Sequence, residues 1–258
     1  MWADRRTRVI LGVLVLAAGV GAAEGEAAAE PKAVLELFTS QGCSSCPPAD
    51  KLLGTYARSD DVIALSFNVD IWDYLGWADT LASHENTERQ RAYAQKRGDR
   101  QVYTPQMIIN GVAHVVGSHG RAVSKAIGDA ERAGGLPIPV SVTLADEAVN
   151  IEVGAAGGPW PMRGVLWLVL FDRSQTVEIG RGENKGRTIT YYNVVRKMQR
   201  LQMWKGAAMS LSLPAAELYE SNADGCAVLL QTEATGGLPG TMIGAAMVDR
   251  RSGYPSGP

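Results

Sequence analysis

Two cysteines separated by two residues offer the clearest chemistry in this chain. Cys43 and Cys46 enclose Ser44-Ser45, and Pro47-Pro48 follows at once. Thiols at this spacing can close a disulfide within one helical turn, and a helix N-terminus favours the thiolate form of a nearby cysteine. By position, Cys43 is predicted to attack a substrate disulfide and Cys46 to resolve the mixed disulfide that forms. The alternatives are a static local disulfide and half of a metal site.

The residues around the pair predict the elements that must hold it. An apolar run of strand length, 33–38, precedes the cysteines, and a helical stretch, 47–56, follows them. Because Pro47 has no N–H, the carbonyl of Cys43 loses its helical donor if Cys43 is the N-cap. Either that carbonyl finds another partner, or the regular helix begins nearer Cys46.

Strands and helices continue to alternate through the first half of the chain. Ser83 and Ser118 are predicted helix caps, and Asn110-Gly111 between two β-prone runs predicts a hairpin. The predicted order is β-α-β-α-β-β-α, which indicates an α/β domain over residues 31–135. Its predicted elements are strands at 33–38, 62–69, 106–109 and 112–116, and helices at 47–56, 84–97 and 120–132.

A second domain, residues 136–258, is predicted to be all-β and sandwich-like. Leu136-Pro137-Ile138-Pro139 has the stiffness of a domain junction, and short alternating runs follow it. Residues 193–204 are predicted as a strand, with a helix as the alternative. The other predicted strands lie at 140–144, 149–153, 164–171, 176–179, 188–195, 208–213, 226–232 and 242–248.

Acidic and aromatic side chains near these strands are candidates for supporting roles. Glu36 is a lone charge in an apolar strand, where it is either a proton carrier or a buried acid satisfied by a partner. Asp70 follows the second strand and is either a second candidate proton carrier or a turn residue. Trp72, Tyr74 and Trp77 are either core residues or an exposed lip that grips an extended apolar peptide.

Composition argues against several classes of function. The formal net charge is −2 and 46% of the residues are hydrophobic, so no basic surplus predicts a nucleic-acid partner. The sequence carries no flavin, nicotinamide or metal motif, and we predict no cofactor. Three cysteines are too few for a disulfide-stapled scaffold, and Cys226 in its apolar run is predicted to be a buried free thiol.

The first thirty residues have the pattern of an export signal. Arg5, Arg6 and Arg8 precede an apolar run, 9–20, and small residues follow it. We therefore predict a signal peptide and linker over residues 1–30. The alternative is an uncleaved anchor, but the run is shorter than the about 20 apolar residues that span a bilayer. No other run reaches that length, so the mature protein is predicted to be free of membrane spans, in the periplasm or secreted, where disulfides persist.

A second motif strengthens the redox interpretation. Thr104-Pro105 directly precedes a predicted strand and the Asn-Gly hairpin, and together with Cys43 and Cys46 it resembles the thioredoxin superfamily. The resemblance implies that Pro105 is cis and packs against the cysteine pair, and that Thr104 lines the substrate groove. Leu37 occupies the position at which many members of that superfamily carry a buried acid.

A narrower resemblance covers nearly the whole mature chain. Four segments are similar to a family of secreted bacterial proteins catalogued as domain of unknown function 1223. This resemblance implies a thioredoxin-like N-terminal domain and leaves the activity open. The segments that carry it are 35–48, 70–77, 103–107 and 191–196.

From these patterns we expect an exported thiol–disulfide oxidoreductase that acts on protein or peptide disulfides. Because no electron-carrying cofactor is predicted, electrons must come from a redox partner protein or a small thiol. One alternative is a non-catalytic extracytoplasmic binding module in which the disulfide is structural. Another is a copper-handling protein in which the dithiol and His114 or His119 hold Cu(I).

Overall fold

The computed structural model of this protein describes residues 30–145, 148–158, 163–216, 218 and 222–250. Residues 1–29 of the predicted signal peptide and linker lie outside the described residues. The α-helices are α1 (Pro47–Tyr56), α2 (His84–Arg97) and α3 (Gly120–Arg132). The strands are β1 (Ala33–Thr39), β2 (Val62–Asn68), β3 (Gln106–Ile109), β4 (Ala113–Val116), β5 (Val140–Ala145), β6 (Ala148–Val153), β7 (Gly164–Glu178), β8 (Thr188–Trp204), β9 (Met209–Pro214), β10 (Gly225–Glu233) and β11 (Pro239–Asp249).

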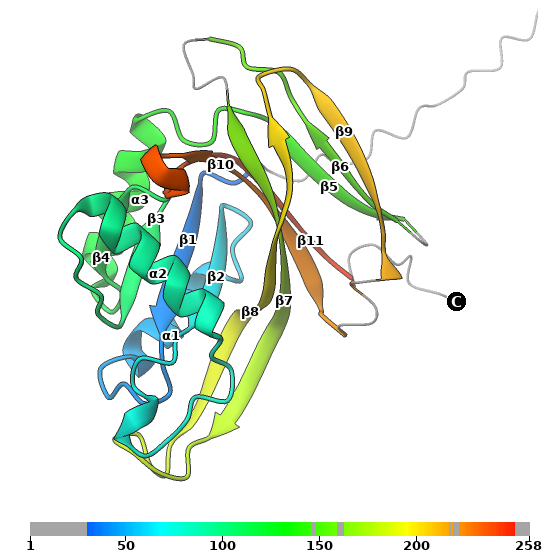
Figure 1. Cartoon of the computed structure of the whole chain (residues 1–258). Coiled ribbons are helices and arrows are strands. Elements are labelled where there is room, and N and C mark those ends of the chain that lie inside the picture. Colours follow the sequence, from blue (N-terminus) through cyan, green and yellow to red (C-terminus); the bar gives the residue numbers. More distant parts are fainter. Residues whose placement is uncertain (1–29, 146–147, 159–162, 217, 219–221, 251–258) are drawn as a thin grey trace, which may run out of the picture.

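One large mixed sheet contains strands from both halves of the chain. Its eight strands run in the order β11-β10-β7-β8-β2-β1-β3-β4, and β5, β6 and β9 form a separate three-stranded sheet (Figure 1). The predicted fold class, an α/β thioredoxin-like domain followed by an all-β sandwich-like domain, is therefore wrong. The described residues are mostly β, with three α-helices. The predicted boundary between residues 135 and 136 stays a prediction.

The physical reason for this correction is the pairing between β2 and β8. Val194 of β8 pairs in parallel with Ser66 of β2. Without β8, β2 would present an open row of N–H and C=O groups at the sheet edge. Hydrophobic periodicity predicts that a segment is a strand, but it does not predict which strand lies beside it.

The two faces of β1 point into different cores. Leu35 and Leu37 face the core that α1 and α3 cover, together with Ala49 and Val123. The alternate residues of β1 face the opposite core with Tyr93 of α2. Figure 1 shows α2 lying across that face of the sheet. Both faces are covered, which is why β1 and β2 are buried along their whole length.

The small sheet packs on the large one and closes a third core. Leu166, Leu168 and Leu170 of β7 lie against the inner side chains of β5 and β6. Cys226 belongs to this core and is a buried free thiol, as predicted. Burial raises the pKa of this thiol to about 12, which keeps it protonated and unreactive at neutral pH.

Several local predictions are confirmed. Asn110 and Gly111 connect β3 to β4 with positive φ angles of 48° and 68°, as a tight hairpin turn requires. Ser83 caps α2 by accepting a hydrogen bond from the Asn86 N–H at 3.1 Å. Residues 193–204 belong to strand β8 rather than to a helix. No helix among the described ranges is long and apolar enough to cross a membrane.

Candidate functional site

Cys43 and Cys46 form a disulfide at the point where the chain leaves β1 and enters α1. Cys46 is the N-cap of α1 and is fully buried, whereas Cys43 is 5% exposed and is followed by two exposed serines. Of the two residues, Cys43 is therefore the more accessible. This asymmetry is what an attacking cysteine and a resolving cysteine require.

The carbonyl of Cys43 finds a partner in the other half of the chain. The Asn184 side chain donates from Nδ2 to the Cys43 carbonyl at 2.8 Å and to the Gln41 carbonyl at 2.9 Å. The helix also begins after Cys46. Both predicted consequences of the missing Pro47 N–H are therefore observed: the Cys43 carbonyl has another donor, and the helix starts nearer Cys46. Asn184 is fully buried, and its other atom, Oδ1, has no hydrogen-bond partner in the described part of the chain.

Asn184 belongs to the hairpin tip, residues 179–187, which connects β7 to β8. Glu183 in this tip accepts a hydrogen bond from the Ser44 N–H at 3.3 Å. A Cβ on Gly180 would lie 3.2 Å from the Trp77 ring, so the tip also packs directly on that indole. The β7–β8 hairpin therefore covers one side of the disulfide loop.

Thr104 and Pro105 are connected to this region through Trp72 and Gly117. The Thr104–Pro105 peptide is cis, as predicted. A Cβ on Gly117 would lie 3.4 Å from Pro105 and 3.2 Å from Ala49, so the proline and the first turn of α1 face each other across this glycine. Trp72 Nε1 donates to Thr104 Oγ1 at 2.7 Å.

The aromatic loop, residues 72–77, has one structural part and one exposed part. Trp77 Nε1 donates to Gln41 Oε1 at 2.7 Å, which ties this indole to the loop before Cys43. Trp72 packs against Gly42, where an added Cβ would lie 3.0 Å from the Trp72 Cβ. Tyr74 is 75% exposed, and its ring centroid lies 6.3 Å from that of Trp72. Trp77 is thus packed, Tyr74 lies at the surface, and the contact of these residues with a peptide stays a prediction.

Asp50 is a buried acid at this site that the sequence analysis did not select. It lies on α1 four residues after Cys46, and its N–H donates to the Cys46 carbonyl at 3.1 Å. Thr39 at the end of β1 donates its hydroxyl to Asp50 Oδ1 at 2.7 Å, while Oδ2 has no hydrogen-bond partner among the described residues. Burial raises the pKa of Asp50 to about 8; the Thr39 hydrogen bond opposes this shift and the charge of Asp79 adds to it.

Asp79 and Tyr191 complete the polar interior behind the disulfide. Asp79 Oδ2 accepts hydrogen bonds from the Gln41 N–H at 2.7 Å and from Asn68 Nδ2 at 3.0 Å. Burial raises the pKa of Asp79 despite these bonds. Burial together with the charges of Asp50 and Asp79 raises the pKa of Tyr191, whose hydroxyl is buried without a described partner. Burial in this region therefore disfavours the charged forms of these groups.

The raised pKa of Asp50 predicts a stability effect of definite sign. Between its ordinary pKa of 3.8 and about 8, folded Asp50 holds a proton that the unfolded chain releases. Its contribution to stability is therefore complete below pH 3.8 and is lost as the pH rises to about 8. We expect Asp50→Asn to raise the free energy of unfolding at pH 8 by roughly 2–4 kcal/mol, since one pKa unit is worth about 1.4 kcal/mol.

Chemical denaturation at several pH values measures this effect. The gain in Asp50→Asn should shrink towards pH 4, whereas Asp60→Asn, which removes an exposed acid close by in sequence, should change stability little at any pH. A gain that does not depend on pH would contradict the assignment of the proton to Asp50.

Glu36 lies away from the disulfide, on the face of β1 that α2 covers. It accepts hydrogen bonds from Arg89 Nε at 2.6 Å and from the Tyr93 hydroxyl at 2.5 Å. Arg89 Nη2 also donates to Gln231 Oε1 of β10 at 3.1 Å. The structure thus places Glu36 in a buried ion pair that connects β1, α2 and β10, and not beside the sulfurs.

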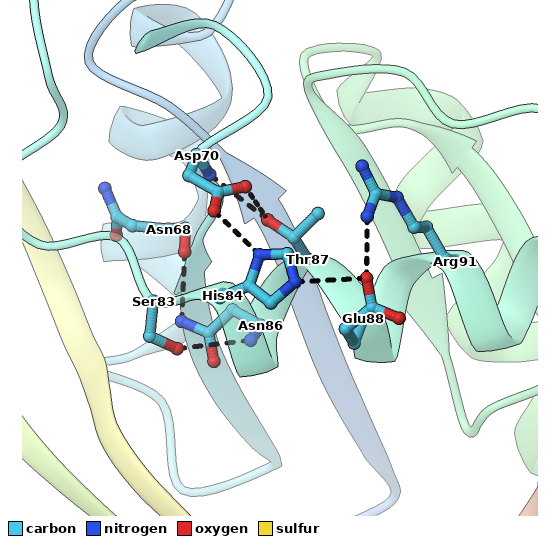
Figure 2. Close-up of polar contacts among 8 residues, drawn as sticks. All are labelled: Asn68, Asp70, Ser83, His84, Asn86, Thr87, Glu88 and Arg91. Atoms are coloured by element: carbon cyan, nitrogen blue, oxygen red, sulfur yellow. Dashed lines mark hydrogen bonds and ion pairs between the residues drawn. The ribbon is translucent and has the colours of Figure 1, made fainter.

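Asp70 anchors the start of α2 to the end of β2. Figure 2 shows its carboxylate between the Thr87 hydroxyl, which donates to it at 2.6 Å, and His84 Nδ1 at 3.0 Å. Burial would raise the pKa of Asp70, but the Thr87 and His84 contacts outweigh it and hold this pKa below its usual range. An acid that stays ionised at neutral pH is a poor proton donor, so the geometry assigns Asp70 an anchoring role.

Metal ligands do not gather around the sulfurs. Across the described ranges, no three His, Cys, Asp or Glu side chains form a group that could hold a metal ion. The candidate copper ligand His114 contacts the Tyr103 hydroxyl at 2.9 Å through Nδ1. His119, the other candidate, is the N-cap of α3 and makes no side-chain capping bond.

Removing the Asn184 side chain tests the contact between the hairpin tip and the disulfide loop. We expect Asn184→Ala to destabilise the protein by about 1–3 kcal/mol, because the Gln41 and Cys43 carbonyls lose buried donors. Amide exchange in residues 41–46 should become faster. Lys185→Ala removes the exposed neighbour and should stay within about 0.5 kcal/mol of wild type. Unchanged exchange in Asn184→Ala would mean that this contact does not order the loop.

The residues that sequence reasoning missed differ in how visible they were. Asp50 had a local signal, since it lies on the apolar face of α1 with Leu53 and one turn after Cys46. Asn184 had none, because it contacts a residue that precedes it by 141 positions.

Comparisons with known proteins give a family and a fold. The model of the family described as protein of unknown function (DUF1223) matches residues 34–231. The crystal structure of protein AGR_C_4864 from Agrobacterium tumefaciens is 40% identical, with a TM-score of 0.78, over 89% of this chain and 97% of that one. HBP35 of Porphyromonas gingivalis is 12% identical, with a TM-score of 0.59, over 88% of this chain and 77% of that one, which is a likeness of fold alone. No curated protein matches the sequence.

Proposed function

Because the chain belongs to the DUF1223 family of proteins of unknown function, we propose from the site itself that it is a thiol–disulfide oxidoreductase acting on protein or peptide disulfides. The observation that carries this proposal is the Cys43–Cys46 disulfide at the N-terminus of α1, in which Cys43 is the more accessible residue. Aromatic and prolyl residues beside it offer a surface for a substrate chain.

The proposed reaction is reversible exchange. In the oxidising direction, a substrate thiolate attacks Cys43 Sγ, the Cys43–Cys46 bond breaks, and Cys46 leaves with the electron pair. A second substrate thiolate then attacks the mixed disulfide and releases Cys43, so the substrate loses two electrons and the protein gains them. In the reducing direction, Cys43 attacks the substrate disulfide and Cys46 releases the product. In the reducing direction, a redox partner protein or a small thiol reduces the Cys43–Cys46 bond again. In the oxidising direction, an oxidising partner protein takes the two electrons and re-forms that bond.

Substrate contact is proposed for the residues that frame Cys43. Tyr74 is exposed, and Trp72 connects the loop before Cys43 to Thr104. An extended peptide lying across Cys43 would meet the Tyr74 ring on one side and the Thr104–Pro105 segment on the other. The aromatic ring offers apolar contact area at low entropy cost.

A relationship to the thioredoxin superfamily is proposed for the site only. The support is local: strand β1, the cysteine loop, helix α1 and a cis Thr104–Pro105 segment adjoin one another. Export to the periplasm or the cell exterior is likewise a proposal, supported by the residue pattern of 1–30 and by a disulfide that oxidising compartments preserve.

A structural disulfide in a non-catalytic binding module is the second candidate. The burial of Cys46 and the low exposure of Cys43 favour it, because a disulfide that only fixes a helix start needs no access. The two candidates differ in redox stability, since structural disulfides have potentials below about −300 mV and catalytic ones lie higher.

The testing experiment combines equilibrium and turnover. Purified mature protein is titrated in dithiothreitol buffers for its potential, and it is then added at catalytic concentration to a disulfide-linked peptide with glutathione. We expect a potential above about −300 mV and faster peptide reduction than glutathione achieves alone. A lower potential without turnover would leave the structural module as the function.

A further inference from the structure

Cys46 does not contact solvent directly, although its chemistry requires a proton to arrive and leave. Its side chain is fully buried at the start of α1. When the disulfide is reduced, Cys46 leaves as a thiolate, and an unpaired thiolate in a buried position is strongly disfavoured. When the mixed disulfide is resolved, Cys46 must instead lose a proton before it attacks. Both directions call for an internal group that exchanges a proton with Cys46.

The geometry points to Asp50 as the group that gives a proton to the leaving Cys46 thiolate and takes it back before Cys46 attacks, an inference that rests on the proposed function. Cys46 has helical φ and ψ angles of −76° and −38°, so the spacing of four residues places both side chains on one face of α1. Side chains on a helix lean towards its N-terminus, which directs Asp50 towards Cys46.

The hydrogen bonding of Asp50 leaves one oxygen for this task. Oδ1 accepts from Thr39, and Oδ2 is buried without a described partner. Buried carboxyl oxygens are nearly always hydrogen-bonded. One without a partner therefore needs an explanation, and a role in catalysis is one such explanation. In the proposed step the Oδ2 proton moves to Cys46 Sγ as the S–S bond breaks, and Asp50 is left as a carboxylate.

Burial favours the protonated form of Asp50 while the disulfide is intact. Asp79, Tyr191 and Thr39 surround it from the aromatic-loop side, from β8 and from β1. Of these, Asp79 is the charged group whose repulsion adds to burial in raising the pKa of Asp50 to about 8. A general acid with a pKa near the working pH is the most effective.

The carboxylates of two other buried acids, Asp79 and Glu36, already have hydrogen-bond or ion-pair partners. Asp79 accepts from the Gln41 N–H, Asn68 Nδ2 and the Leu81 N–H, so its two oxygens are both bonded. Glu36 is held by Arg89 on the opposite face of β1. Asp50 is therefore the acid in this region with both a free oxygen and a place beside Cys46.

Stopped-flow reduction of the oxidised protein tests the assignment. Dithiothreitol is the probe, rates are divided by its thiolate concentration, and the pH is varied from 6 to 9. Wild type should show a normalised rate that falls as the pH passes about 8, where Asp50 loses its proton. Asp50→Asn should be at least about tenfold slower at pH 7 and should lack that inflection.

Two further measurements separate proton transfer from a structural role. Thr39→Val keeps the acid but removes the hydrogen bond that lowers its pKa, so the inflection should persist and move to higher pH. Infrared spectra of the oxidised protein should show a protonated carboxyl band that titrates in wild type and is missing in Asp50→Asn. A wild-type pH profile in a folded Asp50→Asn protein, or a band that survives this substitution, would overturn the inference.

Failure of the Asp50 inference can be distinguished from failure of the proposed function. Reduction by dithiothreitol reports the proton step whether or not a peptide is a substrate. Absence of peptide turnover with an intact Asp50 dependence would reject the oxidoreductase proposal alone. Peptide turnover with no Asp50 dependence would reject the inference alone.

Discussion

Cys43→Ser is expected to reduce disulfide exchange to the uncatalysed rate, because the sulfur that meets the substrate is gone. Cys46→Ser should instead retain the attack and lose the resolution, so that a mixed disulfide between Cys43 and the peptide accumulates. Intact-mass spectrometry after acid quenching measures that adduct, and the peptide assay measures turnover.

The third cysteine provides the matched control. Cys226 is buried in the core between the two sheets, and Cys226→Ala should keep wild-type turnover. If Cys43→Ser rather than Cys46→Ser accumulated the adduct, the roles of the two cysteines would be reversed. Equal turnover in Cys43→Ser and wild type would end the oxidoreductase proposal.

Arg89→Met is expected to be the most destabilising substitution considered, at about 3–5 kcal/mol, because it leaves the Glu36 carboxylate buried without its cation. The guanidinium also donates to the Tyr93 hydroxyl and to Gln231 Oε1. Its loss therefore removes a side chain through which α2 is bonded to β1 and β10. Urea denaturation followed by circular dichroism measures the change.

Two further variants identify the cause of that loss. Arg91→Met on the same helix breaks an exposed pair with Glu88 and should cost less than about 1 kcal/mol. Adding Glu36→Gln to Arg89→Met should recover part of the lost stability, because the unpaired charge is removed. A double variant as unstable as the sum of the single variants would show that charge burial is not the reason.

Most elements of the first half were predictable because their signals are local. Ser83 marks the start of α2, and Asn110-Gly111 marks the β3–β4 turn, since each depends on backbone geometry within a few residues. The cis peptide at Pro105 came from a resemblance to a known motif, not from local physics. The cysteine pair at a helix start was visible for the same local reason.

The fold class was not predictable from those signals. Alternating apolar residues predict β7 and β8 as strands, but nothing in their pattern states that Val194 will pair with Ser66. Strand pairing depends on contacts between segments far apart in the chain, and a local pattern does not contain them. Residues 136–258 were therefore predicted as a separate sandwich-like domain, whereas four of their strands belong to the same sheet as β1 to β4.

The site was predicted in part. The residues that were missed depend on contacts with distant segments, as the fold class does. Glu36 was a candidate proton carrier as a lone charge in an apolar strand, and Asp70 was one as an acid at a strand end. Glu36 is held by Arg89, and Asp70 is held by the His84 imidazole. Asp50 was overlooked because an acid in a helix normally faces solvent. Its burial is set by Thr39, Asp79 and Tyr191, which come from three other segments.

The contact between Asn184 and the Cys43 carbonyl also constrains the length of the β7–β8 hairpin. Between the β2 junction at Val194 and Asn184 the chain has a set number of residues, and each strand residue advances it by about 3.3 Å. Two extra residues in each arm would keep the inward and outward alternation but would carry Asn184 about 7 Å beyond the Cys43 carbonyl. Insertions or deletions in this hairpin should therefore break its contact with the Cys43 carbonyl, a constraint that is unusual for a surface connection.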